Sequence, residues 1–98
     1  MPAETHVEMD PMDRAEVLQI VKAILGGIIE RDADSILEGH SFVDDLEADS
    51  LALIELVEAL EEEFGERQVG FRIEEDDLVN LKTVRDAVDY VYDRVQGL

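Results

Sequence analysis

The chain has 98 residues, of which 46% are hydrophobic and 35% charged, a length and composition that fit one small folded domain. Its 26 acidic and 8 basic residues give a formal net charge of −18, which argues against binding to nucleic acid or to anionic membrane surfaces, because both would repel it. There is no cysteine, so disulfides, thiol nucleophiles and cysteine metal sites are excluded.

The first residues, MPAETHVEMD, are polar and show no periodicity. We expect residues 1–10 to form a flexible tail and residues 11–98 to form the single domain. The tail is acidic and lacks the apolar run of a signal peptide. No stretch approaches the ~20 apolar residues that a membrane helix needs. We therefore expect a cytoplasmic protein that does not insert into membranes.

A helix is predicted from Met12 to about Glu30, where apolar residues recur at helical spacing, at Val17, Ile20, Val21, Ile24 and Ile28. Gly26 and Gly27 weaken its last turn, by roughly 1 kcal/mol per glycine relative to alanine. Residues 31–48 have no regular period but carry apolar side chains at Ile36, Leu37, Phe42, Val43 and Leu46. Such a connection is typical of a loop laid over a helical core.

A second helix is predicted from about Asp49 to Phe64, with an apolar stripe at Leu53, Leu56, Val57, Leu60 and Phe64. Gly65 follows, where a C-terminal cap belongs. A short helix is predicted near Glu75 to Asn80. The last helix begins at TVRD, where Thr83 and Asp86 match a capping box, and its stripe is Val84, Val88, Val91 and Val95.

These elements predict an all-α fold. Period-2 alternation, the mark of a half-buried strand, is scarce along the chain. The predicted architecture is a small four-helix bundle with three main helices, one short helix and a long first loop.

The segment DDLEADSLALIELVEALEEEFG, from Asp44 to Gly65, contains nine acidic residues and no basic one. Like charges three or four residues apart on a helix repel by a few tenths of a kcal/mol per pair. An exposed face of one sign is therefore better explained as a docking surface for partners with basic patches. The alternative is that the charge only maintains solubility. Leu51 and Ile54 lie near this face and would add an apolar contact.

Ser50 stands at the start of this helix, directly after Asp49, which is a good N-cap residue. A serine nucleophile needs a base within reach, and the two histidines are His6 in the tail and His40 in the loop. A calcium loop starting at Asp45 fails because its sixth position is Ser50 instead of glycine. We predict no catalytic residue and no metal site. Ser50 is then either an ordinary residue of the helix cap or a hydroxyl that another protein modifies.

The string ADSLALIELVEALEEEFG resembles the central signature of the acyl carrier proteins, an Asp-Ser-Leu followed by an acidic helix. FVDDLEADSL resembles the loop that leads into it. The resemblance spans about residues 16–95 and implies the same order of helices. It implies that Ser50 carries 4'-phosphopantetheine, attached by a separate phosphopantetheinyl transferase, and that Asp49 assists this step. The chain would be a carrier that holds acyl groups as thioesters, not an enzyme.

The resemblance also implies which residues meet partners. Leu51, Ile54, Glu55, Glu61 and Glu62 match positions that family members present to basic patches on synthases, acyltransferases and reductases. Glu58 belongs to the same face, although many members have an apolar residue there. The acyl chain itself would enter the core between the helices, lined by Phe42, Leu46, Leu56, Leu60 and Ile73. We expect a monomer.

Several positions depart from the family pattern. Ala52 replaces a frequent polar residue, Glu74 replaces the proline that often follows the position of Ile73, and the segment 65–74 is longer than in common fatty-acid carriers. These departures make a polyketide or specialised lipid pathway as plausible as fatty acid synthesis. Two alternatives stay open. One is a carrier of aminoacyl or peptidyl groups, although such domains are usually less acidic and often have glycines before the serine. The other is an unmodified acidic helical docking module.

Overall fold

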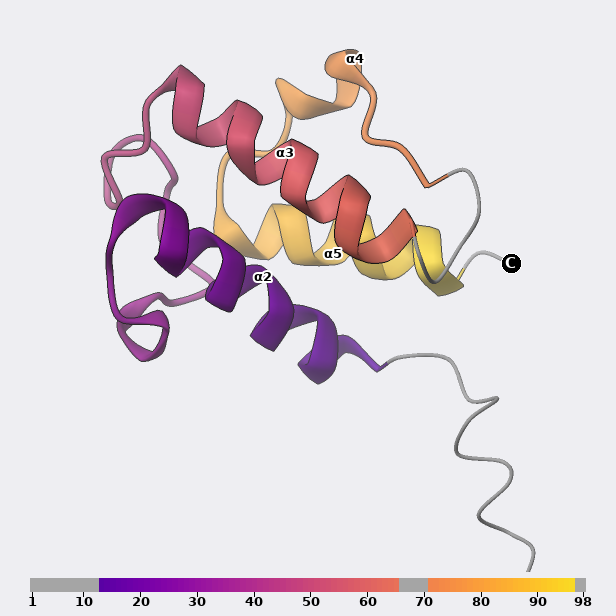
Figure 1. The fold of residues 1–98 in the computed structure, drawn as a ribbon, viewed down its shortest axis with the longest axis horizontal. Coiled ribbons are helices and arrows are strands. Elements are labelled where there is room, and N and C mark those ends of the chain that lie inside the picture. The colour runs from indigo at the N-terminus through magenta and orange to yellow at the C-terminus, as the bar shows by residue number, and fades with distance from the viewer. Residues whose placement is uncertain (1–12, 66–70, 97–98) are drawn as a thin grey trace, which may run out of the picture.

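The computed structural model describes residues 13–65 and 71–96. Its helices in chain order are α2 (Arg14–Ile29), the 3₁₀ turn η1 (Ala33–Ser35), α3 (Ser50–Gly65), α4 (Glu75–Leu78) and α5 (Val84–Gln96). Figure 1 shows α2, α3 and α5 as the long helices of the fold and the short α4 in the connection from α3 to α5. The predicted tail at 1–10 lies outside the described residues.

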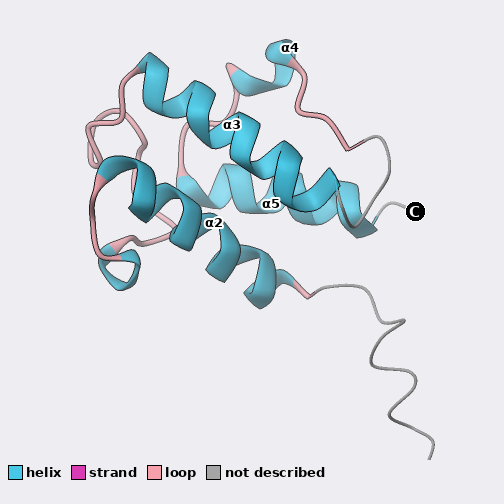
Figure 2. Cartoon of the chain, viewed as in Figure 1, coloured by secondary structure: helices cyan, strands magenta, loops and turns pink. Residues whose placement is uncertain are grey.

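The described residues form helices and loops (Figure 2), and one isolated antiparallel bridge joins Ser41 and Thr83. The all-α class, the three long helices, the short helix and the long first loop are therefore confirmed. The capping box is confirmed too: Thr83 Oγ1 accepts from the N–H of Asp86, whose carboxylate accepts from the N–H of Thr83, both at 3.1 Å.

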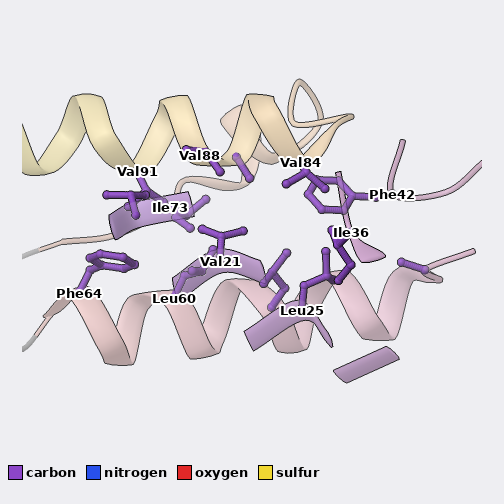
Figure 3. Packing of buried hydrophobic residues seen from close by; sticks show 14 of the residues in the cluster. Val21, Leu25, Ile36, Phe42, Leu60, Phe64, Ile73, Val84, Val88 and Val91 are labelled. Atoms are coloured by element: carbon purple, nitrogen blue, oxygen red, sulfur yellow. The ribbon is translucent and has the colours of Figure 1, made fainter. Parts of the chain in front are cut away.

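Within the described residues an apolar core lies between the long helices, and the loop contributes to it. Figure 3 shows Phe42 beside Val84 at one end of this core, Phe64 at the other end, and Val21 and Leu60 between them. The predicted stripes match this core only in part: Ile20, Ile24 and Ile28 of α2 and Val95 of α5 are half-buried, and Leu25, outside the predicted stripe, is fully buried. In the stripe of α3, Leu53 and Val57 are only half-buried, whereas the remaining three residues are buried: Leu56, Leu60 and Phe64. The core therefore meets a narrower face of α3 than the spacing predicted.

The end of α2 differs from the expected weak turn, since the helix continues through both glycines to Ile29. Gly26 is buried, and a Cβ at this position would lie 2.7 Å from the carbonyl oxygen of Arg31. A hydrogen bond between the same two residues closes the helix, because the carbonyl of Gly26 accepts from the N–H of Arg31 at 2.9 Å. Gly26 thus allows the chain to fold back against its own helix.

The long loop lies over the core as predicted, held by Ile36, Phe42 and Leu46, which are all buried. Leu37 and Val43 are instead 59% and 60% exposed. The loop has no regular period, so its apolar residues could not be divided into inward and outward sets from the sequence.

Candidate functional site

The first turn of α3 is organised by Asp49. Its Oδ1 accepts from the N–H of Ala52 at 2.8 Å, and its carbonyl accepts from the N–H of Leu53 at 3.0 Å. The predicted N-cap role of Asp49 is therefore confirmed. Ser50 is the first residue of the helix and is exposed. Its hydroxyl is accessible at the positive end of a 16-residue helix.

The loop before Ser50 has a fixed backbone. The carboxylate of Asp45 accepts from the N–H of Ser41 at 2.7 Å, and the N–H of Ala48 donates to the carbonyl of Phe42 at 2.8 Å. Ala48 is 3% exposed, and Glu47 has a φ of 57°, in the left-handed region. The chain turns sharply at Glu47, buries Ala48 and then presents Ser50 at the surface.

The surroundings of Ser50 offer no catalytic machinery of the serine-hydrolase kind. His40 Nδ1 accepts from the N–H of Leu37 at 3.0 Å, so this nitrogen is occupied within the loop. His6 lies outside the described residues. Across residues 13–65 and 71–96 no group of three or more metal-binding side chains could hold an ion. Among the described residues, Ser50 therefore has no histidine positioned beside it as a base.

The predicted docking residues differ in their surroundings. Leu51 and Ile54 are 62% and 49% exposed, an uncommon exposure for large apolar side chains beside a buried core. Three of the acids, Glu55, Glu58 and Glu62, are also exposed. They follow one another at intervals of three and four residues, so they share one face of α3. This acidic face lies next to the two exposed apolar side chains.

Glu61 behaves differently from its neighbours. Its side chain is only 25% exposed, its Oε2 accepts from the N–H of Ile73 at 2.9 Å, and Arg72 Nε lies 3.6 Å away. This carboxylate is directed at the chain that returns after α3. Its proposed role in partner binding must therefore compete with a contact inside the molecule.

A pocket of about 420 Å³ opens beside the start of α3. Leu53, one turn after Ser50, forms part of its wall, and the remaining lining residues are Ser41, Phe42, Val43, Asp44, Leu78, Val79, Leu81 and Lys82. All five residues expected to line an acyl site are buried, as Phe42, Leu46, Leu56, Leu60 and Ile73 are each at most 7% exposed. Only Phe42 among these five borders the pocket, so the pocket leads toward the core without reaching the others.

An ionic cluster fastens the first part of the loop. Arg14 of α2 donates to Glu38 Oε1 at 2.7 Å and to Asp89 Oδ1 at 2.8 Å, and Arg85 lies 3.6 Å from Glu38. The hydrogen bond from Arg14 is the main reason that the pKa of Glu38 is lowered from 4.5, with burial opposing it. The same carboxylates raise the pKa of Arg14 further above its ordinary range. The cluster joins α2, the loop and α5 through Glu38 and its partners.

A second polar cluster was not anticipated from the sequence. Asp77 of α4 accepts from the hydroxyl of Tyr90 at 2.8 Å and from Arg94 Nη2 at 3.1 Å. The guanidinium of Arg94 also lies over the Tyr90 ring, 4.4 Å from its centroid. Burial, and then the hydrogen bond to Asp77, raise the pKa of Tyr90 from 10.0. These groups are 13 and 17 residues apart, beyond what helical spacing can relate.

Comparison with known proteins assigns the class of this site. Residues 19–91 match the family model described as "Phosphopantetheine attachment site". Phosphopantetheine is therefore the cofactor of this domain. The structure suits such a group, because Ser50 is exposed and the first turn of a long helix favours a nearby phosphate.

Individual relatives define the family more closely. The chain is 39% identical over 84 residues to an acyl carrier protein from Thermosynechococcus vestitus, an alignment that covers 86% of this chain and 98% of that protein. It is 41% identical to one from Rubrobacter xylanophilus, covering 82% of this chain and 93% of the other. A solved structure of the acyl carrier protein from Enterococcus faecalis superimposes with a TM-score of 0.67 at 38% identity, covering 84% of this chain and 98% of that one.

The chain belongs to the acyl carrier protein family. It is a carrier and not an enzyme, and family membership implies a phosphopantetheinyl transferase and biosynthetic enzymes as partners. In the described ranges, no helix is both long and apolar enough to cross a membrane.

Proposed function

We propose that Ser50 is the attachment residue for 4'-phosphopantetheine, and that the chain presents acyl thioesters to enzymes of fatty acid, polyketide or specialised lipid biosynthesis. The observation that carries this proposal is the exposure of Ser50 as the first residue of α3, directly after the cap formed by Asp49. The attached group would supply the thiol that this cysteine-free chain lacks.

Attachment requires Ser50 to act as a nucleophile toward coenzyme A within a transferase. Its hydroxyl oxygen would form a phosphodiester with the phosphopantetheine phosphate, adenosine 3',5'-bisphosphate would leave, and the hydroxyl proton would pass to a base on the transferase. Asp49 holds the backbone of this turn through Ala52 and lies next to the reacting hydroxyl. A metal ion at this step would take most of its ligands from the transferase, since the described residues hold no cluster able to bind one.

The docking surface in this proposal is the acidic face of α3 together with its exposed apolar residues. Glu55, Glu58 and Glu62 would attract lysine and arginine side chains of a partner, mainly raising the rate of encounter. Leu51 and Ile54 would supply the apolar contact that is buried when the complex forms. Their position beside Ser50 would bring the partner's active site to the attached arm. Glu61 belongs to this set only if a partner draws its carboxylate away from Ile73.

The proposal is tested by intact mass before and after incubation with coenzyme A and a promiscuous phosphopantetheinyl transferase. We expect a gain of one phosphopantetheine, mapped to Ser50 by peptide analysis. The gain should be absent in Ser50→Ala and retained in Ser35→Ala, which removes another exposed serine. A folded sample that gains no mass with several transferases would contradict the attachment, and would favour an unmodified docking module.

A loading test then addresses the acyl group. Acyltransferases and ligases specific for fatty acyl, malonyl or aminoacyl groups would each be offered the modified protein. We expect acyl groups to load, and exclusive loading of an aminoacyl group would overturn the assignment to acyl biosynthesis.

A further inference from the structure

The pocket beside the start of α3 is lined by the long loop, by α3 and by the chain at the end of α4. Its inner side is formed by the loop at Phe42 and by Leu53 of α3, which belong to or pack against the core. Another side is formed by Leu78 and Val79 at the end of α4, and by Leu81, which packs against the core. A ligand in this pocket would therefore contact the segment 74–81 through Leu78, Val79 and Leu81.

The segment 74–81 is fastened at both ends. Before it, the N–H of Ile73 donates to Glu61 at 2.9 Å, and after it the carbonyl of Lys82 accepts from the N–H of Phe42 at 2.9 Å. Between these points its backbone hydrogen bonds are local, as in the bonds from the N–H of Leu78 to Glu74 O and from that of Leu81 to Leu78 O. A helix as short as α4, with four residues, does not hold itself together without outside contacts.

Apolar packing contributes little to holding this segment. None of the described side chains of 74–81 is buried, Val79 is 70% exposed, and within this segment only the half-buried Leu81 packs against the core. Leu81 borders the pocket beside the start of α3 and also a second, open hollow of about 550 Å³ on the side of Tyr90. Leu81, in the chain after α4, therefore lies between two hollows.

The contact of α4 with α5 is instead polar. The carboxylate of Asp77 accepts from Tyr90 at 2.8 Å and from Arg94 at 3.1 Å, and the Tyr90 hydroxyl also has a hydrogen bond with the backbone of Glu74 at the start of α4. The stacking of Arg94 on the Tyr90 ring fixes the two donors relative to each other. Asp77 lies midway between the fixed points at Ile73 and Lys82, where one attachment limits the movement of the whole segment.

We propose that Tyr90 and Arg94 form a latch on Asp77, and that the segment 74–81 is a lid whose release widens the pocket beside the start of α3. The proposal rests on the carrier function proposed above, because the ligand that the lid would retain is the acyl chain delivered from Ser50. Tyr90, Arg94 and Asp77 act on that chain only through the position of α4, and so are positioning residues.

The test compares three variants in the full chain. Tyr90→Phe removes only the hydroxyl that donates to Asp77 and keeps the aromatic ring. Asp77→Asn keeps an acceptor but removes the charge that attracts Arg94. Tyr92→Phe is the matched control, because Tyr92 is the other tyrosine of the chain, is also half-buried on α5 and lies outside the latch. Circular dichroism establishes that each variant is folded.

The first readout is amide hydrogen exchange of the unmodified protein, which needs neither the arm nor an acyl group. In Tyr90→Phe we expect amides of 74–81 to exchange roughly three- to tenfold faster, the factor that a typical hydrogen bond supplies. Asp77→Asn should give a smaller increase. Tyr92→Phe should leave these amides unchanged, and amides of α2 should be unchanged in all three variants.

The second readout is the rate at which hydroxylamine cleaves an octanoyl thioester on the modified protein. We expect cleavage in Tyr90→Phe to accelerate by a similar factor, while the mass gain on modification stays complete. Equal exchange in Tyr90→Phe and Tyr92→Phe would overturn the latch. Faster exchange with unchanged cleavage would overturn the lid. Failure of the wild-type chain to gain mass at Ser50 would instead contradict the carrier function, and the exchange result would still decide whether the latch exists.

Discussion

The Oε2 atom of Glu61 lies 2.9 Å from the backbone nitrogen of Ile73 and accepts its hydrogen bond. This contact joins α3 to the chain that returns toward α4, and it places one acid of the charged helix in a structural role. Phe71 and Ile73, on either side of Arg72, are both buried. Glu61 therefore fixes the backbone of the segment that brings Phe71 and Ile73 into the core.

Replacing Glu61 with alanine should destabilise the protein. The change removes a hydrogen bond to a charged acceptor, and we expect a loss of about 1–2 kcal/mol in the free energy of unfolding. Glu62→Ala is the matched control, since Glu62 is exposed and its loss should be neutral or slightly stabilising through reduced repulsion. Urea denaturation measures both. Equal stability of the two variants would show that the bond to Ile73 contributes nothing.

The contrast between Glu61 and Glu62 also marks the limit of sequence reasoning here. The family resemblance assigned both to the partner-facing surface of α3, and Glu62 is exposed there. The partner of Glu61 is 12 residues away, across a connection without periodicity. A pattern within one helix contains no information on such a contact.

The long helices and the caps at Asp49 and Thr83 were predictable because their signals are local, whereas the capping box of Asp13 and Glu16 at the start of α2 was not predicted. Apolar spacing located α2, α3 and α5 and most of their buried residues, although Leu25 and Ala87 are buried outside the predicted stripes, and the TVRD string located the start of α5. The exposed start of α3 was predictable for the same reason, since Asp49 and Ser50 are adjacent to the segment they cap. The cluster of Asp77, Tyr90 and Arg94 was not, because it depends on how α4 is placed against α5.

The two adjacent glycines of α2 should respond in opposite ways to alanine. At Gly26 a Cβ would lie 2.7 Å from Arg31 O, so the closing turn must shift, and overpacking of this kind costs roughly 1–3 kcal/mol. At Gly27 a Cβ would meet nothing within 4 Å, and alanine should stabilise the helix by about 0.5–1 kcal/mol. Thermal unfolding of both variants tests this. Stabilisation by Gly26→Ala would mean that the turn at Arg31 can move at no cost.

Because of Glu38, the free energy of unfolding of the protein should depend on pH in the acidic range. Its pKa is lowered in the folded state, chiefly by the hydrogen bond from Arg14, so its contribution is present above the unfolded value near 4.5 and is lost as the pH falls through the folded value. Glu38→Gln should therefore cost about 0.5–1 kcal/mol at neutral pH, a modest figure because both side chains are partly exposed. The difference from wild type should vanish below the folded pKa. Denaturation curves from neutral to acidic pH measure it, and a difference independent of pH would assign the effect to packing.

The acidic face of α3 should make stability depend on salt. Glu55, Glu58 and Glu62 are exposed at intervals of three and four residues, and each like-charged pair costs a few tenths of a kcal/mol at low ionic strength. Added salt or magnesium should therefore raise the midpoint of thermal unfolding. Glu58→Gln removes both pairs at once, and should raise the midpoint in low salt by about 2–4 °C, given the sensitivity of a domain of this size.

The matched control for the charge effect is Asp34→Asn, which removes the same charge from the exposed turn η1. If repulsion is concentrated on α3, Glu58→Gln should both raise the midpoint more than Asp34→Asn and reduce its salt dependence. Equal effects of the two variants would mean that the net charge of −18 acts as a whole. Concentrated repulsion is also what a basic partner would relieve, so the same variant should bind such a partner more weakly, and chiefly through slower association.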